Sequence, residues 1–170
     1  MNKIIGFLVI FMLLVLQIAF VPHMSLFGVY PNFLLAAILI FAVMRGGIWV
    51  FLFAFFSGAA LDIFSSQAFG IYTLSFILLV WLIEFVGKNL FKATDFSGQI
   101  SILALSCTLF SFLTPLFIKN FYWLGLGQNI GFWDNLLRIG LLEIMLNFVL
   151  AILGLMVFKK THAQLYNLGL

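Results

Sequence analysis

Apolar residues are grouped into long runs along this chain, and short polar stretches separate the runs. Three runs, at residues 4–21, 100–118 and 136–158, are long enough to cross a membrane as helices, because a spanning helix needs about 20 mostly apolar residues. A fourth run, at residues 71–86, is nearly as long. The pattern therefore predicts helices that cross a lipid bilayer.

Two further apolar runs, at residues 33–44 and 48–61, are each too short to span a bilayer at full thickness. Between them lie Arg45, Gly46 and Gly47, one charged and two flexible residues that favour a tight turn. The two runs can form two short spans, or one hairpin that dips into the membrane, and both arrangements return the chain to the side where it entered. A single long helix through both runs would instead reverse the orientation of every later segment.

The distribution of Lys and Arg distinguishes these alternatives, because cytoplasmic loops of membrane proteins are enriched in positive charge. Six segments with the N-terminus inside place most basic residues in the cytoplasm: Lys3, Arg45, Lys88, Lys92, Lys159 and Lys160. Lys119 and Arg138 then lie outside. A five-span chain would move Lys88, Lys92, Lys159 and Lys160 to the outside, against this rule. We therefore expect a compact bundle of six short transmembrane helices, one domain over residues 1–170, with both termini cytoplasmic.

The composition also indicates an integral membrane protein. Of its residues, 65% are hydrophobic and 8% are charged, whereas soluble domains carry about 25% charged residues. The basic residues are scattered over chain ends and connections, so the net charge of +3 indicates no nucleic-acid binding. The first apolar run is longer than that of a signal peptide and no small-residue cleavage site follows it, so we expect a retained helix. A single cysteine, Cys107, excludes a disulfide framework.

Small and polar residues recur at helical spacing in three of the predicted helices, where they would let neighbouring helices approach closely. The third segment carries Ala54, Gly58 and Asp62. The fifth carries Ser101, Ala104, Thr108, Ser111 and Pro115. The sixth carries Gly140, Glu143, Asn147, Ala151 and Gly154. We expect most of these residues to serve ordinary packing inside the bundle.

Ionisable groups inside a bilayer require an explanation, because each costs about 3 kcal/mol at the helix centre. Glu143 lies deep in the last segment and shares a face with Asn147. We expect Glu143 to face the bundle or a partner helix; a proton relay is the alternative, although no second acid or histidine joins it at that depth. Two acid–base pairs four residues apart are expected to form local ion pairs: Glu84 with Lys88, and Asp134 with Arg138.

Asp62 falls where the third segment leaves the membrane on the outer face. There its carboxylate can accept hydrogen bonds from Ser65, Ser66 or backbone N–H groups and so organise the turn towards Gly70. If a helix restarts near Gly70, the positive helix end would also favour the acid. We expect this structural role first, and a role in shaping an outward-facing surface for a partner as the alternative.

No catalytic motif stands out in the chain. The sequence contains no H-E-x-x-H, no G-x-S-x-G and no glycine-rich phosphate loop. Its serines have no histidine at membrane depth to activate them. We therefore predict no catalytic site, no cofactor and no metal, and we expect binding or scaffolding rather than a reaction.

Several motifs together resemble the MreD family of rod shape-determining membrane proteins. They are Pro31-x-Phe33-Leu34, the charged turn at Arg45, Gly58-x3-Asp62-x7-Gly70-x-Tyr72, and the stretch 134–158 with Asp134 and Asn147. The length and the number of short spans match the family as well. The candidate partner-binding or structural residues are Pro31, Arg45, Gly58, Asp62, Gly70, Tyr72, Asp134, Glu143 and Asn147.

The resemblance implies a fold similar to the substrate-binding subunits of energy-coupling-factor transporters. It implies a multi-pass protein of the bacterial cytoplasmic membrane that binds MreC, alongside MreB, RodA and a penicillin-binding transpeptidase, and helps control lateral peptidoglycan synthesis without a reaction of its own. The alternative is a vitamin-binding subunit of such a transporter. Those subunits typically carry Ala-x3-Ala near the start of the first helix, and this chain has no such pair there.

Overall fold

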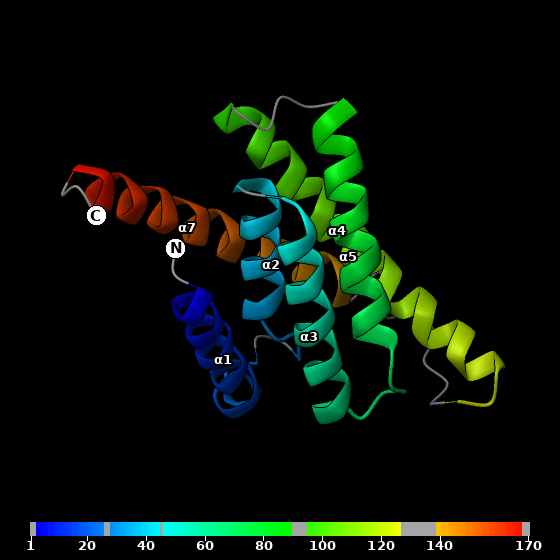
Figure 1. Ribbon diagram of the computed structural model, residues 1–170. Coiled ribbons are helices and arrows are strands. Elements are labelled where there is room, and N and C mark those ends of the chain that lie inside the picture. The colour runs from blue at the N-terminus through cyan, green and yellow to red at the C-terminus, as the bar shows by residue number, and fades with distance from the viewer. Residues whose placement is uncertain (1–2, 26–27, 45, 90–94, 127–138, 168–170) are drawn as a thin grey trace.

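A computed structural model of the protein describes residues 3–25, 28–44, 46–89, 95–126 and 139–167. This part of the chain contains six α-helices, one short 3-10 turn and no β-strand (Figure 1). The helices are α1 (Lys3–Ala19), α2 (Phe33–Met44), α3 (Ile48–Phe64), α4 (Ile71–Asn89), α5 (Phe96–Trp123) and α7 (Leu141–Asn167), with the turn η1 (Val21–His23) after α1. The prediction of an all-helical fold is confirmed.

Two helices extend well beyond the apolar runs that predicted them, and α3 and α4 each extend three residues further than predicted. α5 begins at Phe96 and ends at Trp123, and α7 continues to Asn167. An apolar run marks the part of a helix that suits lipid, whereas the helix itself continues for as long as its backbone hydrogen bonds can form. The apolar runs therefore locate these two helices along the chain and underestimate their lengths.

α2 is the central helix of the bundle. It contacts α1, α3, α4, α5 and α7, and the residues from Leu34 to Leu39 are almost fully buried. A helix that is apolar on every side is stable only where neighbours surround it, which explains why this short run carries no polar face. At 12 residues, α2 is about 18 Å long, shorter than a bilayer core of about 30 Å.

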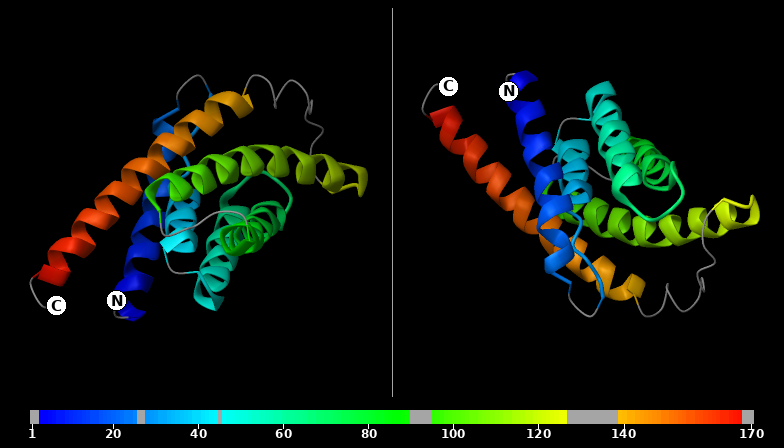
Figure 2. Two further views of the ribbon diagram at one scale, coloured as in Figure 1. Left: turned by 90° about the horizontal axis from the view of Figure 1, so that it is seen from above. Right: turned by 90° about the horizontal axis from the view of Figure 1, so that it is seen from below.

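The chain passes up and down through the bundle. α2, α3 and α4 run in alternating directions, so the turn at residues 46–47 and the loop at residues 65–70 lie at opposite ends (Figure 1). We call these the turn end and the loop end. The beginning of α1 and the end of α7 lie on one side of the molecule (Figure 2). This arrangement gathers the end of α3, the start of α4 and the start of α2 at the loop end.

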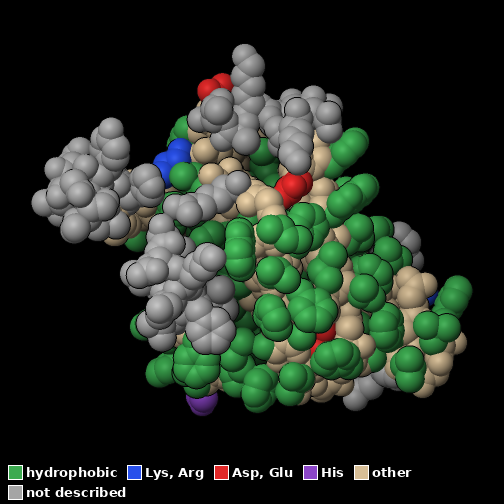
Figure 3. Space-filling model, in the orientation of Figure 1, with side chains coloured by type: hydrophobic (Ala, Val, Ile, Leu, Met, Phe, Trp, Pro, Cys, Tyr) green, Lys and Arg blue, Asp and Glu red, His purple; other side chains and the backbone are tan. Residues whose placement is uncertain are grey.

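The outer surface of the bundle is apolar. Large side chains such as Trp49, Phe56 and Trp81 are more than half exposed, and apolar atoms cover most of the described surface over α3 and α4 (Figure 3). Two helices, Phe96–Trp123 and Leu141–Thr161, are long and apolar enough to cross a membrane. A surface of this kind is typical of a protein surrounded by lipid, so the helices fit a membrane protein.

The small-residue faces in the third and sixth segments pack inside the bundle. Ala54 and Asp62 of α3 and Asn147 and Ala151 of α7 are all at most 3% exposed. Gly154 also belongs to this contact, because a Cβ at Gly154 would lie 2.6 Å from a side-chain carbon of α2. These two faces therefore allow close contact between helices, as the spacing predicted.

The corresponding prediction for the fifth segment is partly wrong. Ser101 and Thr108 are exposed, although Ser111 and Pro115 are buried. The Ser101 hydroxyl donates to the backbone oxygen of Ser97 (3.0 Å), and the Thr108 hydroxyl donates to that of residue 104 (2.9 Å). Because a serine or threonine can satisfy its hydroxyl within its own helix, these two require no neighbouring helix.

Candidate functional site

The carboxylate of Asp62, near the end of α3, caps the start of α4. Its Oδ1 accepts a hydrogen bond from the backbone N–H of Tyr72 (2.8 Å), and its Oδ2 accepts from the backbone N–H (3.0 Å) and the hydroxyl (2.5 Å) of Thr73. The first N–H groups of a helix lack partners within the helix, and that end carries partial positive charge. Asp62 meets both needs at a site where it is 3% exposed. This contact explains how α4 begins inside the protein.

The sequence suggested Ser65, Ser66 or backbone N–H groups as donors to the Asp62 carboxylate. The structure shows backbone N–H groups in this role. Ser65 has a different role: its hydroxyl donates to the backbone oxygen of Asp62 (3.2 Å) and accepts from the N–H of Gln67 (3.4 Å). The serine therefore shapes the loop after α3, while the carboxylate holds α4.

Gly58 allows α3 to lie directly against the start of α4. A Cβ at Gly58 would lie 2.5 Å from Cα of Thr73 and 3.0 Å from the backbone oxygen of Tyr72. A non-bonded contact of 2.5 Å to a Cβ atom is essentially never seen in proteins, and one of 3.0 Å is unusually tight. The neighbours are backbone atoms, which cannot rotate away as a side chain would. Gly58 lies one turn before Asp62 on the same face, so the missing side chain brings the carboxylate within reach of its donors.

Gly70 begins the turn into α4. Its φ of +107° lies in a region that residues with a side chain rarely adopt, and its carbonyl accepts the N–H of Leu74 (2.9 Å). Gly58, Asp62, Gly70 and Tyr72 were selected from one sequence motif. The structure brings all four together at the junction of α3 and α4.

A second acid makes a similar contact at the turn end. Glu84 of α4 accepts a hydrogen bond from the backbone N–H of Gly47, at the start of α3. Each of these two antiparallel helices thus places an acid at the N-terminal end of the other, where the helix dipole favours negative charge. The predicted pair of Glu84 with Lys88 lies outside the described residues, because the side chain of Lys88 is not described.

A polar cluster holds the start of α2. Asn147 of α7 accepts the N–H of Asn32 (2.8 Å), and the side-chain oxygen of Asn32 accepts the N–H of Leu35 (2.9 Å). Gln17 of α1 accepts the N–H of Phe33 (2.7 Å) and donates to the oxygen of Pro31 (3.2 Å). Side chains from α1, from the residue before α2 and from α7 therefore accept the N–H groups at the start of α2, which lack partners within the helix.

Sequence reasoning selected Pro31 and Asn147 and missed Gln17 and Asn32. Both missed residues carried a usable signal. Asn32 directly precedes an apolar run, the position where Asn is a favoured helix cap, and Gln17 is a lone polar residue inside an apolar run. The Nδ2 atom of Asn147 has no hydrogen-bond partner among the described residues.

We predict that Asn147→Leu lowers the free energy of unfolding by about 1–3 kcal/mol, because it leaves the buried N–H of Asn32 without an acceptor. The matched control is Asn120→Leu. Asn120 is exposed on α5 and bonds only within its own helix among the interactions of the described residues. Unfolding in mild detergent measures both variants, and equal losses for the two would contradict the role given to Asn147.

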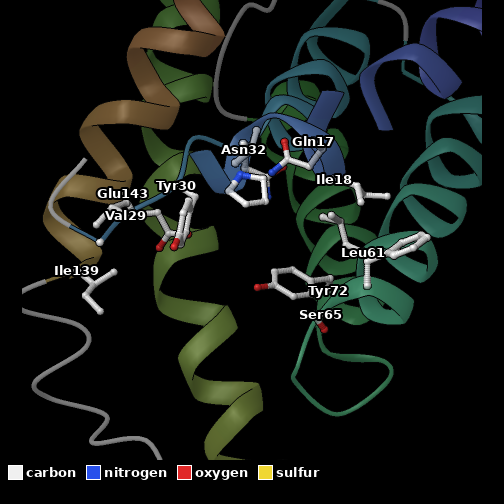
Figure 4. Close-up of a pocket in the computed structure, with 14 residues that line it drawn as sticks. Gln17, Ile18, Val29, Tyr30, Asn32, Leu61, Ser65, Tyr72, Ile139 and Glu143 are labelled. Atoms are coloured by element: carbon white, nitrogen blue, oxygen red, sulfur yellow. The ribbon is translucent and has the colours of Figure 1, made fainter. Parts of the chain in front are cut away.

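A cavity of about 320 Å³ opens between these two junctions at the loop end. Its walls come from α1, the segment before α2, the end of α3, the start of α4 and the start of α7. Tyr72 extends into it from α4, with its hydroxyl directed towards the side where Tyr30 and Glu143 lie (Figure 4). Glu143 therefore faces this cavity from within the protein and is only partly buried.

Two of the selected residues, Arg45 and Asp134, lie outside the described residues, as does Arg138, the predicted partner of Asp134. The other seven gather around the α3–α4 junction, the start of α2 and the cavity between them. In the described part of the chain, no three His, Cys, Asp or Glu residues are grouped to hold a metal ion. The chemistry available here is hydrogen bonding and two carboxylates, Asp62 at the helix junction and Glu143 at the cavity.

The model of a protein family described as rod shape-determining protein MreD matches residues 1–162. The chain belongs to the MreD family. This membership confirms the resemblance that the motifs indicated. No curated protein and no solved structure matches the chain.

Membership in the MreD family makes the chain a rod shape-determining membrane protein. The match includes both helix junctions, the cavity and all nine selected residues. The family is named for an effect on cell shape and not for a reaction, which agrees with a site built from helix caps and close backbone packing.

Proposed function

We propose that the chain is a non-enzymatic component of the bacterial rod complex, in which it binds MreC and helps control lateral peptidoglycan synthesis. MreB, RodA and a penicillin-binding transpeptidase belong to the same complex in this proposal. The family match over residues 1–162 is the observation that carries it. The capped junctions support a scaffolding role, because they hold helix ends at fixed positions to which another protein can bind.

The proposed location is the cytoplasmic membrane, with six spans and both termini in the cytoplasm. Three observations support this location and orientation. The helices α2, α3 and α4 alternate in direction (Figure 1), the outer surface is apolar, and the Lys and Arg residues favour a cytoplasmic turn end. The loop end, with Asp62 and the cavity, then faces outward.

Purification of the tagged chain from native membranes in mild detergent tests the proposed partner. We expect MreC to copurify with the chain and to be retained through a size-exclusion column. The Asp95→Asn variant, which alters an exposed acid at the start of α5, should retain as much MreC as the unaltered chain. Copurification of ATP-binding-cassette subunits in place of MreC would contradict the proposal and favour the transporter alternative, which the comparisons do not support.

A further inference from the structure

The cavity at the loop end combines apolar walls with one acid. Among its described lining residues, the apolar contribution includes Ile18, Val21, Leu61 and Phe64, and the single carboxylate is Glu143. No Lys, Arg or His is among the described lining residues. A volume of about 320 Å³ lies at the small end of the range for ligand sites.

Two tyrosines lie near this acid. Tyr30 and Tyr72 both line the cavity, and the Tyr72 hydroxyl points towards the side that Glu143 and Tyr30 occupy (Figure 4). The backbone N–H of Tyr72 donates to Asp62, and its hydroxyl makes no hydrogen bond to another described residue. A carboxylate, an aromatic face and a phenolic oxygen are the groups that proteins use to bind organic cations.

We propose that this cavity binds the ammonium group of an amphipathic molecule, with Glu143 as the anionic contact. A partly buried carboxylate beside apolar walls is stabilised by a cation that binds next to it, and the apolar walls suit the stem that carries the cation. The ammonium group can come from two sources: the headgroup of an aminophospholipid from the surrounding membrane, or a free alkylammonium ion. Neither source requires the chain to bind MreC.

Titration calorimetry with hexylammonium in mild detergent tests the site on the purified full chain. Hexanol and hexanoate share the stem and differ in charge, so we expect neither to bind. Glu143→Gln should weaken hexylammonium binding at least about tenfold, because a charge-assisted hydrogen bond contributes about 1.5–3 kcal/mol. Glu143→Asp keeps the charge and should retain most of the affinity, and Asp95→Asn should bind as the unaltered chain does.

Tyr72→Phe removes only the hydroxyl and provides a second variant, should Glu143→Gln fail to fold. We expect it to weaken hexylammonium binding about threefold or more. Equal binding of hexanol, or unchanged affinity in both the Glu143→Gln and Tyr72→Phe variants, would overturn the proposal. So would an absence of hexylammonium binding.

Native mass spectrometry distinguishes the two sources. The chain is exchanged into detergent with equal amounts of phosphatidylethanolamine and phosphatidylglycerol, and the retained lipid is identified. Retention of phosphatidylethanolamine by the unaltered chain but not by Glu143→Gln supports the lipid headgroup. Hexylammonium binding without such retention supports the free ion. Equal retention of both lipids by both proteins, together with no hexylammonium binding, would overturn the site.

Discussion

Replacing Asp62 with Ala is expected to lower the free energy of unfolding by about 2–4 kcal/mol. The variant leaves the backbone N–H groups of Tyr72 and Thr73 without their acceptor, and each buried unsatisfied group costs about 1–3 kcal/mol. It also removes a negative charge from the positive end of α4. Unfolding in mild detergent measures the effect, and the amount of protein in membranes should fall several-fold with it.

A graded series identifies the cause. Asp62→Asn keeps one side-chain acceptor and should cost less than Asp62→Ala. Asp95→Ala is the matched control, because Asp95 stands at the start of α5 and its side chain makes no capping hydrogen bond there. Equal stability of Asp62→Ala and Asp95→Ala, with normal amounts of both in the membrane, would remove Asp62 from the functional residues.

Adding one methyl group at Gly58 is expected to have the second large effect. Gly58→Ala places a carbon 2.5 Å from Cα of Thr73, so the start of α4 must move away from α3. Overpacking of this kind costs about 1–3 kcal/mol. Because the same movement carries Tyr72 and Thr73 away from the Asp62 carboxylate, the loss should approach that of Asp62→Ala.

The two changes should also combine in a specific way. The Gly58→Ala and Asp62→Ala double variant should lose less stability than the sum of the single losses, because both act on one junction. Gly154→Ala is the comparison, since its new methyl group meets only the end of the Ile40 side chain, which can rotate. An unfolding series in which Gly58→Ala is no worse than Gly154→Ala would refute the close approach of α3 and α4.

α3 and α4 each carry an acid that binds the N-terminal end of the other helix. Asp62 of α3 holds one end of the helix pair and Glu84 of α4 holds the other, so the two helices form a unit fixed at both ends. A partner that binds at the loop end would then meet a surface whose shape does not depend on lipid contacts alone. This rigidity agrees with the scaffolding role proposed above.

Much of the fold could be predicted from the sequence, because a helix that suits lipid is a continuous run of mostly apolar residues. The starts of α2 and α3, at Phe33 and Ile48, coincide with the starts of their apolar runs. The stripe from Ala54 to Asp62 indicated a packed face, because small residues at a spacing of four lie on one side of a helix. These inferences need only neighbours along the chain.

The contacts of the site could not be predicted, because they join distant segments. Asn32 and Asn147 are 115 positions apart, and no local pattern pairs them. Spacing was also misleading in α5, where Ser101 and Thr108 form a stripe but satisfy their hydroxyls within their own helix. The cavity around Glu143 depends on α1, α3, α4 and α7 together, so only the folded chain shows it.

Labelling from outside the cell tests the central claim most directly. Ser66→Cys at the loop end and Ser97→Cys at the start of α5 are matched exposed positions, and each is made in a Cys107→Ala background that removes the buried native thiol. In intact spheroplasts, the account predicts that a membrane-impermeant thiol reagent labels the cysteine at position 66, and labels that at position 97 only after permeabilisation. Labelling of position 97 from outside, with position 66 protected, would contradict it.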